Sequence, residues 1–145
     1  MKRSKRLEPV DVLMNEAERE CALRVAAVQT RLAEAEHRGQ ELRRYLGEYQ
    51  SAFRQRAKAG IGAPGMRDYQ SFIARLGEAV QQQDGVVSQL RADCEQARTL
   101  WRQAAVRKNA VGKVIAKARS EDLQLEARRV QKESDERAVR FGGAR

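Results

Sequence analysis

Side chains that could bind a metal ion or act as a base or nucleophile are few in this sequence of 145 residues. It contains one histidine, His37, and two cysteines, Cys21 and Cys94, with no CxxC motif. Protein metal sites need more ligands of these types than the sequence brings together, so no metal site is expected. His37 has arginine, glycine and acidic neighbours, a setting more typical of a solvated histidine than of a general base.

The segment GIGAPG at residues 60–65 is the only glycine-rich stretch that resembles a phosphate-binding loop. A phosphate loop of that kind follows a strand and ends in Gly-Lys-Ser/Thr, and neither feature is present here. The acidic residues are scattered along what would be solvent-facing positions. The sequence therefore predicts a binding or structural protein, not an enzyme, with no catalytic residues and no cofactor.

The aromatic side chains are better candidates for a functional site, because they could bind another protein. The chain has three tyrosines, three phenylalanines and one tryptophan. Most of them gather around the glycine-rich segment, namely Tyr45, Tyr49, Phe53, Tyr69 and Phe72. Aromatic residues are among the types most enriched at the energetic centres of protein interfaces, so this clustering calls for an explanation.

The elements that position these aromatics are predicted by hydrophobic spacing. Apolar or small residues recur at alternating steps of three and four over residues 25–53 and again over residues 69–118, with charged residues between them. That spacing is typical of a coiled-coil seam, the row of residues that faces a partner helix. A composition with 34% charged and 5% aromatic residues also fits long helices.

The predicted fold is all-α: two long helices forming an antiparallel coiled-coil hairpin with a C-terminal helical overhang. Helix one is expected over about residues 9–58 with Pro9 in its first turn, the turn at about 59–66, and helix two over about 67–141. Residues 1–145 are expected to form a single coiled-coil unit. One continuous helix dimerising in parallel is the alternative, and it would have to run through the glycine-rich turn.

In the hairpin, facing residues should have numbers that sum to about 125. Cys21 and Cys94 then lie beyond disulfide reach, and both are expected to be small buried residues. Residues 117–141 are left without a partner helix, and the seam positions there become Asp122, Leu125, Arg129 and Lys132. This overhang is either a frayed, solvated end or a helix that a partner completes, and the sequence leaves both open.

The net charge of +9 is concentrated near the C-terminus, where residues 101–145 hold twelve basic and six acidic side chains. Such a bias favours an acidic partner or nucleic acid. No segment approaches the roughly 20 apolar residues of a membrane span, and the N-terminal basic residues precede no apolar run. A cytoplasmic location without membrane insertion is expected.

Beside the turn, the apolar face is wider than two helices need. Second rows of apolar residues lie next to the seam on both predicted helices: Leu42, Tyr45 and Tyr49 on the first, and Phe72, Leu76, Ala79 and Gln83 on the second. These rows either cover the end of the hairpin or form a docking patch. The patch is favoured, because two adjacent rows exceed what two helices can bury between themselves.

The same residues resemble those of FliJ, the coiled-coil component of the bacterial flagellar export apparatus. The resemblance covers nearly the whole chain in length and layout, and its specific motifs are Leu42-x-x-Tyr45-x-x-x-Tyr49, Gly60-Ile61, Tyr69-Gln70-Ser71-Phe72-Ile73-x-x-Leu76-x-x-Ala79-Val80 and Trp101-Arg102. It implies an antiparallel two-helix stalk, similar to the central stalk of rotary ATPases, that enters the ring of the hexameric flagellar export ATPase and promotes its assembly.

The resemblance also implies contacts with the cytoplasmic region of the transmembrane export gate and exchange with export chaperones. Carried over by position, the gate-binding residues are Leu42, Tyr45, Tyr49, Phe72, Leu76 and Ala79, with Gln83 at the edge of the set. Two positions depart from the family pattern, since Arg38 stands where a glutamine is expected and Gln83 where a histidine is usual. The candidates for binding the ATPase ring are Arg119, Arg128, Arg129 and Lys132.

The implied protein is monomeric when free and peripherally associated with the export apparatus at the inner membrane. A close alternative is the equivalent stalk of a virulence type III secretion system. A basic helical nucleic-acid-binding protein is an alternative of another class, and it predicts binding that weakens steeply with salt. Against it, the aromatics and the basic excess lie in different parts of the chain. A homodimeric coiled coil is a third alternative.

Overall fold

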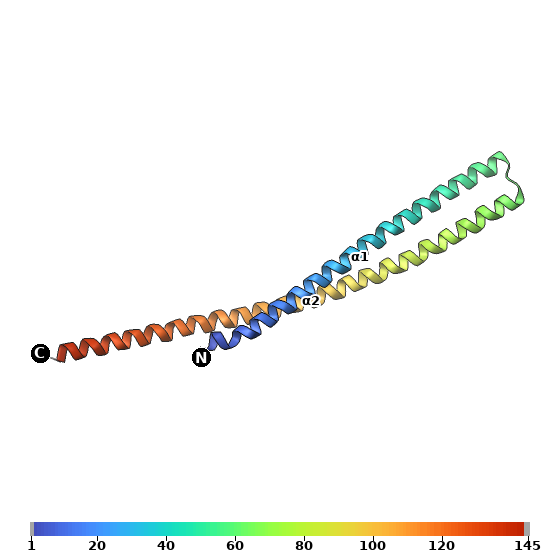
Figure 1. Cartoon of the computed structure of the whole chain (residues 1–145). Coiled ribbons are helices and arrows are strands. Elements are labelled where there is room, and N and C mark those ends of the chain that lie inside the picture. Colours follow the sequence, from blue (N-terminus) through green and yellow to red (C-terminus); the bar gives the residue numbers. More distant parts are fainter. Residues whose placement is uncertain (1, 144–145) are drawn as a thin grey trace. The chain divides into compact units, whose positions relative to one another are not determined.

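A computed structural model describes residues 2–143, which form two long α-helices joined by residues 60–62. Helix α1 comprises Arg3–Ala59 and helix α2 comprises Ala63–Gly143 (Figure 1). The described residues contain no strand. The predicted all-α class with two long helices is therefore confirmed.

Contacts between the helices group the described residues into two compact units. The turn unit is Ala22–Thr99, and the terminal unit consists of the described residues of Met1–Cys21 and Leu100–Arg145. Each unit contains a segment of α1 running antiparallel to a segment of α2 (Figure 1). The expectation of one coiled-coil unit over residues 1–145 stays a prediction.

The connection is shorter than the predicted turn over residues 59–66. Gly60 has φ of +89°, in the left-handed region that favours glycine, and its N–H donates to the carbonyl of Ala57 at 3.4 Å. Pro64 lies in the first turn of α2, where its missing N–H removes no helical hydrogen bond. The N–H of Met66 already donates to the carbonyl of Gly62 at 3.0 Å, so α2 starts four residues before Arg67.

Helix α1 begins at Arg3, which corrects the predicted start at Pro9. Pro9 lies inside the helix. The early start is stabilised by α2, because Ser4 is buried and donates to Asp122 Oδ2 through both its backbone N–H (3.3 Å) and its hydroxyl (2.6 Å). The first turn of α1 has no acidic residue of its own, so Asp122 supplies the negative charge that a helix N-terminus favours.

The longer α1 also shortens the overhang. Arg3 forms an ion pair with Glu121 at 3.5 Å, next to the Ser4–Asp122 contact. The segment without a partner helix therefore begins after Asp122, not at residue 117. We call residues 123–143 the overhang.

Polar contacts between the helices fix the register in both units. In the terminal unit Ser4 bonds Asp122 and Glu18 pairs with Lys108; in the turn unit Arg43 pairs with Asp84 and Glu36 with Arg91. Each pair of numbers sums to within two of the predicted value. The antiparallel register predicted for the hairpin, with facing numbers that sum to about 125, is confirmed.

Small side chains dominate the interior of this two-helix structure. The buried hydrophobic residues among those described are Ala35, Val87, Cys94, Ala97, Ala104, Ile115 and Ala118. Within residues 2–143 no large side chain is fully buried, as expected when two helices shield each other. Cys94 is buried as predicted, whereas Cys21 is only half-buried, and both are free thiols.

The Ser4–Asp122 contact predicts a pH dependence at the N-terminus of α1. The Ser4 hydroxyl, with help from the Ser4 N–H and the charges of Lys2 and Arg3, lowers the pKa of Asp122 against the opposing effect of partial burial. A carboxyl with a lowered folded pKa stabilises docking at pH values above its unfolded pKa, and the stabilisation is lost as pH falls through the folded pKa.

We therefore expect the first turns of α1 to separate from α2 below about pH 4. The Ser4 amide resonance, followed by NMR during an acid titration, should report that change. In Asp122→Asn the resonance should no longer follow this titration. A Ser4 resonance that titrates identically in the variant and the wild type would contradict the assignment.

Candidate functional site

The aromatic residues around the connection come together across the two helices of the turn unit. The rings of Tyr49 and Phe72 are 4.5 Å apart between centroids and inclined by 50°. The rings of Phe53 and Tyr69 are 5.9 Å apart. Both tilted arrangements are favourable for aromatic pairs, so each pair links α1 to α2.

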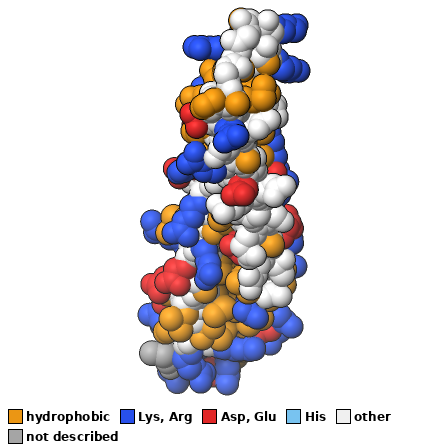
Figure 2. Space-filling view, turned by 90° about the vertical axis from the view of Figure 1, so that its right-hand side faces the viewer, with side chains coloured by type: hydrophobic (Ala, Val, Ile, Leu, Met, Phe, Trp, Pro, Cys, Tyr) orange, Lys and Arg blue, Asp and Glu red, His pale blue; other side chains and the backbone are white. Residues whose placement is uncertain are grey.

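The predicted gate-binding residues all lie in the turn unit. We call the following set the turn-proximal patch: Leu42, Tyr45, Tyr49, Phe72, Leu76 and Ala79. Its aromatic members remain accessible, with Tyr45 41%, Tyr49 40% and Phe72 38% exposed, while its other members are half-buried. Figure 2 shows hydrophobic side chains exposed on the surface beside Lys and Arg side chains. The aromatic rings can therefore still bury a large apolar area against a partner.

Gln83 lies in the seam rather than on the accessible part of the patch. Its Nε2 donates to the backbone carbonyl of Ala35 on α1 at 3.0 Å, and its side chain is half-buried. Gln83 lies beside the buried Gly39, where an added Cβ would be 3.6 Å from Gln83 Cγ, an ordinary van der Waals distance. The amide is thus hydrogen-bonded within the protein, which favours a role for Gln83 in helix pairing.

The two edges of the turn unit differ in chemistry. One edge is bridged by the ion pairs Arg43–Asp84 and Glu36–Arg91. The opposite edge carries uncharged side chains, which include Val86 at 47% exposure. The sequence interpretation missed Val86, although its spacing of seven from Ala79 and fourteen from Phe72 could have indicated it.

Trp101 in the terminal unit falls within the stretch of three-and-four spacing over residues 69–118, but it is not buried. Its ring is 38% exposed, and its Nε1–H donates to Glu18 Oε1 at 3.0 Å. The seam positions on either side are filled by the buried Ala97 and Ala104. A bulky indole whose N–H needs an acceptor lies better at the edge of such a narrow seam than inside it.

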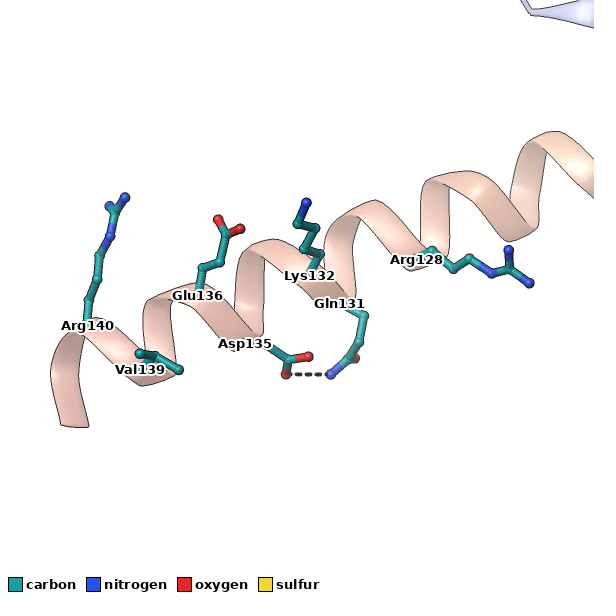
Figure 3. Close-up of a pocket in the computed structure, with 7 residues that line it drawn as sticks. All are labelled: Arg128, Gln131, Lys132, Asp135, Glu136, Val139 and Arg140. Atoms are coloured by element: carbon teal, nitrogen blue, oxygen red, sulfur yellow. Dashed lines mark hydrogen bonds between the residues drawn. The ribbon is translucent and has the colours of Figure 1, made fainter. Parts of the chain in front are cut away.

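The predicted ATPase-binding residues Arg119, Arg128, Arg129 and Lys132 are all exposed. Arg129 forms an ion pair with Glu126 at 2.9 Å, which partly neutralises it. Figure 3 shows Lys132, Glu136 and Arg140 pointing to the same side of α2, and Gln131 Nε2 donates to Asp135 Oδ1 at 3.0 Å on another side. Arg128 and Lys132 lie beside a shallow hollow that is lined entirely by α2 residues.

The overhang also exposes apolar side chains. These are Leu123, Leu125, Val130, Val139 and Phe141. No residue of α1 forms a hydrogen bond or ion pair with the described part of the overhang, and all of it except Glu126 is exposed. A single helix of this length is marginal in water, so an additional surface would stabilise it.

No helix within residues 2–143 is both long and apolar enough to cross a membrane. Those residues also contain no group of three or more His, Cys, Asp or Glu side chains placed to hold a metal ion.

Comparison with known proteins identifies the relationship. The family described as "Flagellar FliJ protein" matches residues 3–144. A search of curated proteins finds no match, and a search of solved structures finds none either. Since the family match spans essentially the whole chain and agrees with the two-helix fold, this protein belongs to the FliJ family of flagellar proteins.

Proposed function

We propose that this FliJ-family protein is the non-enzymatic stalk of a flagellar type III export system, coupling the hexameric export ATPase to the export gate. Family membership supports a role in flagellar protein export. The proposal that the chain has two separate binding surfaces is supported by one observation: the two units expose different kinds of side chain. Half-exposed aromatics lie in the turn unit, and an exposed cationic helix without a partner lies in the terminal unit.

The turn-proximal patch is proposed to bind the cytoplasmic region of the export gate. Tyr45, Tyr49 and Phe72 are the anchors, because each combines a large apolar ring with substantial accessibility. The contact between Tyr49 and Phe72 holds two of these rings in place before a partner arrives. Such preorganisation reduces the entropy lost on binding.

The terminal unit is proposed to bind the ATPase ring and to promote its assembly. Arg119, Arg128 and Lys132 form no hydrogen bond or ion pair among the described residues and are exposed, so they can meet acidic side chains of the ring. Arg129 is a weaker candidate, because Glu126 already pairs with it. Exposed apolar residues of the overhang would be buried in the same contact.

The stalk role also has consequences for where the chain acts and what else it binds. The chain acts in the cytoplasm, associates peripherally with the export apparatus at the inner membrane, and exchanges with export chaperones. It is monomeric when free and binds neither nucleotide nor nucleic acid directly. The equivalent stalk of a virulence type III secretion system shares this architecture, and the family match favours the flagellar role.

The proposal is tested by capture with three immobilised baits: the export ATPase, the cytoplasmic region of the gate, and single-stranded DNA. The purified chain should bind both proteins at physiological ionic strength and should not retain DNA. Retention on DNA alone, with a steep loss as salt rises, would instead identify a nucleic-acid-binding protein. Failure to bind either protein bait would overturn the stalk assignment.

A further inference from the structure

Two glycines lie inside the helices of the turn unit at the same level. Gly47 is on α1 and Gly77 is on α2, and their numbers sum to within one of the register value of about 125. Each stands in the same tripeptide, Leu-Gly-Glu, at residues 46–48 and 76–78, and both helices continue through it (Figure 1). A residue type that weakens helices therefore occurs in both helices at one level.

Neither packing nor backbone conformation requires glycine at these two positions. Beyond the adjacent residues, a Cβ added at Gly47 or Gly77 would have no side chain and no atom of the facing helix within 4 Å. Both also lack a positive φ, which among the described glycines only Gly60 has. Alanine would thus fit at both positions and would favour the helix, so what glycine provides here is backbone freedom.

The residues before the two glycines keep an apolar contact surface at this level. Leu46 and Leu76 are both half-buried, although they lie near the exposed end of the hairpin. Their burial shows that the helices still shield each other where the glycines weaken them. A bend at this level would therefore involve both helices together and would not need them to separate.

The cross-helix contacts described above lie on one side or the other of the glycine level. On the side toward the connection, the nearest in sequence is the ring contact between Tyr49 and Phe72. On the side away from it, the nearest is the ion pair between Arg43 and Asp84. Two separately braced segments of the hairpin thus meet at the glycines.

One ion pair along α1 does cross the level, and it contributes little. Arg44 Nε lies 3.8 Å from Glu48 Oε1, and both side chains are 63% exposed. Exposed pairs of this kind stabilise a helix only slightly, because water screens them. The level is therefore held mainly by the helical backbone, which glycine weakens.

A second pair of glycines shares a level but is braced. The numbers of Gly39 and Gly85 also sum to within one of the register value. There the Gln83 side chain crosses the level, since its Nε2 donates to the carbonyl of Ala35 on the other helix. Gly39 is also buried in the seam. This contrast assigns the flexible level to the other pair.

The level of Gly47 and Gly77 divides the turn-proximal patch into two halves. Leu42, Tyr45 and Ala79 lie on the side away from the connection, whereas Tyr49, Phe72 and Leu76 lie on the side toward it. A bend between the halves would change the distance from the Tyr45 ring to the other two rings of the patch.

We propose that Gly47 and Gly77 form a hinge at which the end of the hairpin next to the connection bends as one body. The bend moves Tyr49 and Phe72 together relative to Tyr45 and adjusts the shape of the turn-proximal patch to its partner. This inference rests on the proposed function for the identity of that partner, the gate's cytoplasmic region. The hinge itself is a property of the free chain.

Amide hydrogen exchange of the full chain, followed by mass spectrometry, tests the hinge. After correction for intrinsic rates, exchange should have a local maximum at residues 44–50 and 74–80 and should be slower at residues 51–54 and 69–72, where the aromatic pairs lie. Gly47→Ala should slow exchange about fivefold around both glycines, and Gly77→Ala should do the same, because one opening loosens both helices.

The bending is measured by the distance between two spin labels on α1, one on each side of Gly47. Glu34→Cys and Arg54→Cys place the labels at exposed positions about 30 Å apart, in a chain whose native cysteines are replaced by alanine. The distribution of distances from pulsed electron resonance should be broad with both glycines present. It should narrow in Gly47→Ala/Gly77→Ala.

Gly112→Ala is the matched control. Gly112 is exposed inside α2 in the terminal unit, and a Cβ added there also has nothing within 4 Å beyond its neighbours. The substitution should slow exchange near residue 112 and leave the exchange around Gly47 and Gly77 unchanged. Circular dichroism should show every alanine variant to be at least as helical as the wild type.

Three results would overturn the hinge. The first is exchange that rises steadily toward the connection, which indicates fraying of the hairpin end. The second is slowing by Gly47→Ala on α1 alone. The third is a distribution of label distances that is the same with and without the two glycines.

Capture of the gate's cytoplasmic region separates this inference from the proposed function. Gly47→Ala/Gly77→Ala should weaken capture at least about fivefold, because the bent form becomes rarer, whereas Gly112→Ala should not. If the exchange and label results are as expected but the wild type does not bind the gate region, the hinge is correct and the proposed function fails. If the wild type and the double variant bind that region equally well, the adjustment of the patch is wrong and the proposed function stands.

Discussion

Replacing both Tyr45 and Phe72 with alanine should weaken binding of the gate's cytoplasmic region by at least about 30-fold, the effect of losing about 2 kcal/mol at an interface hot spot. Both rings are large and about two-fifths exposed, so a partner can bury much of their area. Tyr45 lies outside the row of seam residues, and the Phe72 ring packs against the ring of Tyr49. Helicity and binding of the ATPase should therefore be retained.

Trp101→Ala is the matched control for this double variant. Trp101 is also exposed to a similar degree, but it lies in the terminal unit and donates to Glu18. Its loss should leave gate binding unchanged in a titration by isothermal calorimetry. Equal gate binding by the double variant and the wild type, with both folded, would remove the turn-proximal patch from the proposal.

Deleting residues 123–145 should reduce binding of the ATPase by at least about tenfold, because it removes three of the four cationic candidates. The described overhang forms no polar contact with α1, and the Ser4–Asp122 contact that ends the paired region is retained. Thermal unfolding of the truncated chain should therefore occur within a few degrees of the wild type. Co-sedimentation with the ATPase measures the loss.

A charge reversal in the overhang shows whether individual basic side chains bind the ATPase or whether the overhang helix alone is enough. Arg128→Glu/Lys132→Glu should weaken ATPase binding in the full-length chain, and the loss should shrink as salt is raised because exposed charges are screened. Arg54→Glu/Lys58→Glu makes the same change of net charge near the connection and should have little effect. Equal losses in the two variants would indicate that only overall charge matters.

Much of the fold was predictable because the seam spacing is regular. The steps of three and four over residues 25–53 and 69–118 indicate two long helices, and the short connection with glycines at 60 and 62 favours an antiparallel pair. The aromatic cluster was predictable for a related reason. Once the register is known, Tyr49 and Phe72 must lie near each other across the connection, as they do.

The errors came from contacts that local sequence does not encode. Pro9 resembles a first-turn proline, but the bond from Ser4 to a carboxylate 118 positions away extends α1 to Arg3. Trp101 is 38% exposed between the buried Ala97 and Ala104, and its N–H bonds to Glu18, a residue 83 positions away.

The proposal that the terminal unit binds the ATPase while the turn unit binds the gate region is tested most directly by simultaneous binding of both partners. The molar mass of a mixture of chain, hexameric ATPase and gate region should be measured by light scattering after size exclusion. We predict one complex that contains all three components, and loss of only the gate region when the chain carries Tyr45→Ala/Phe72→Ala. Displacement of the ATPase by the gate region, with no ternary complex at any ratio, would contradict the proposal.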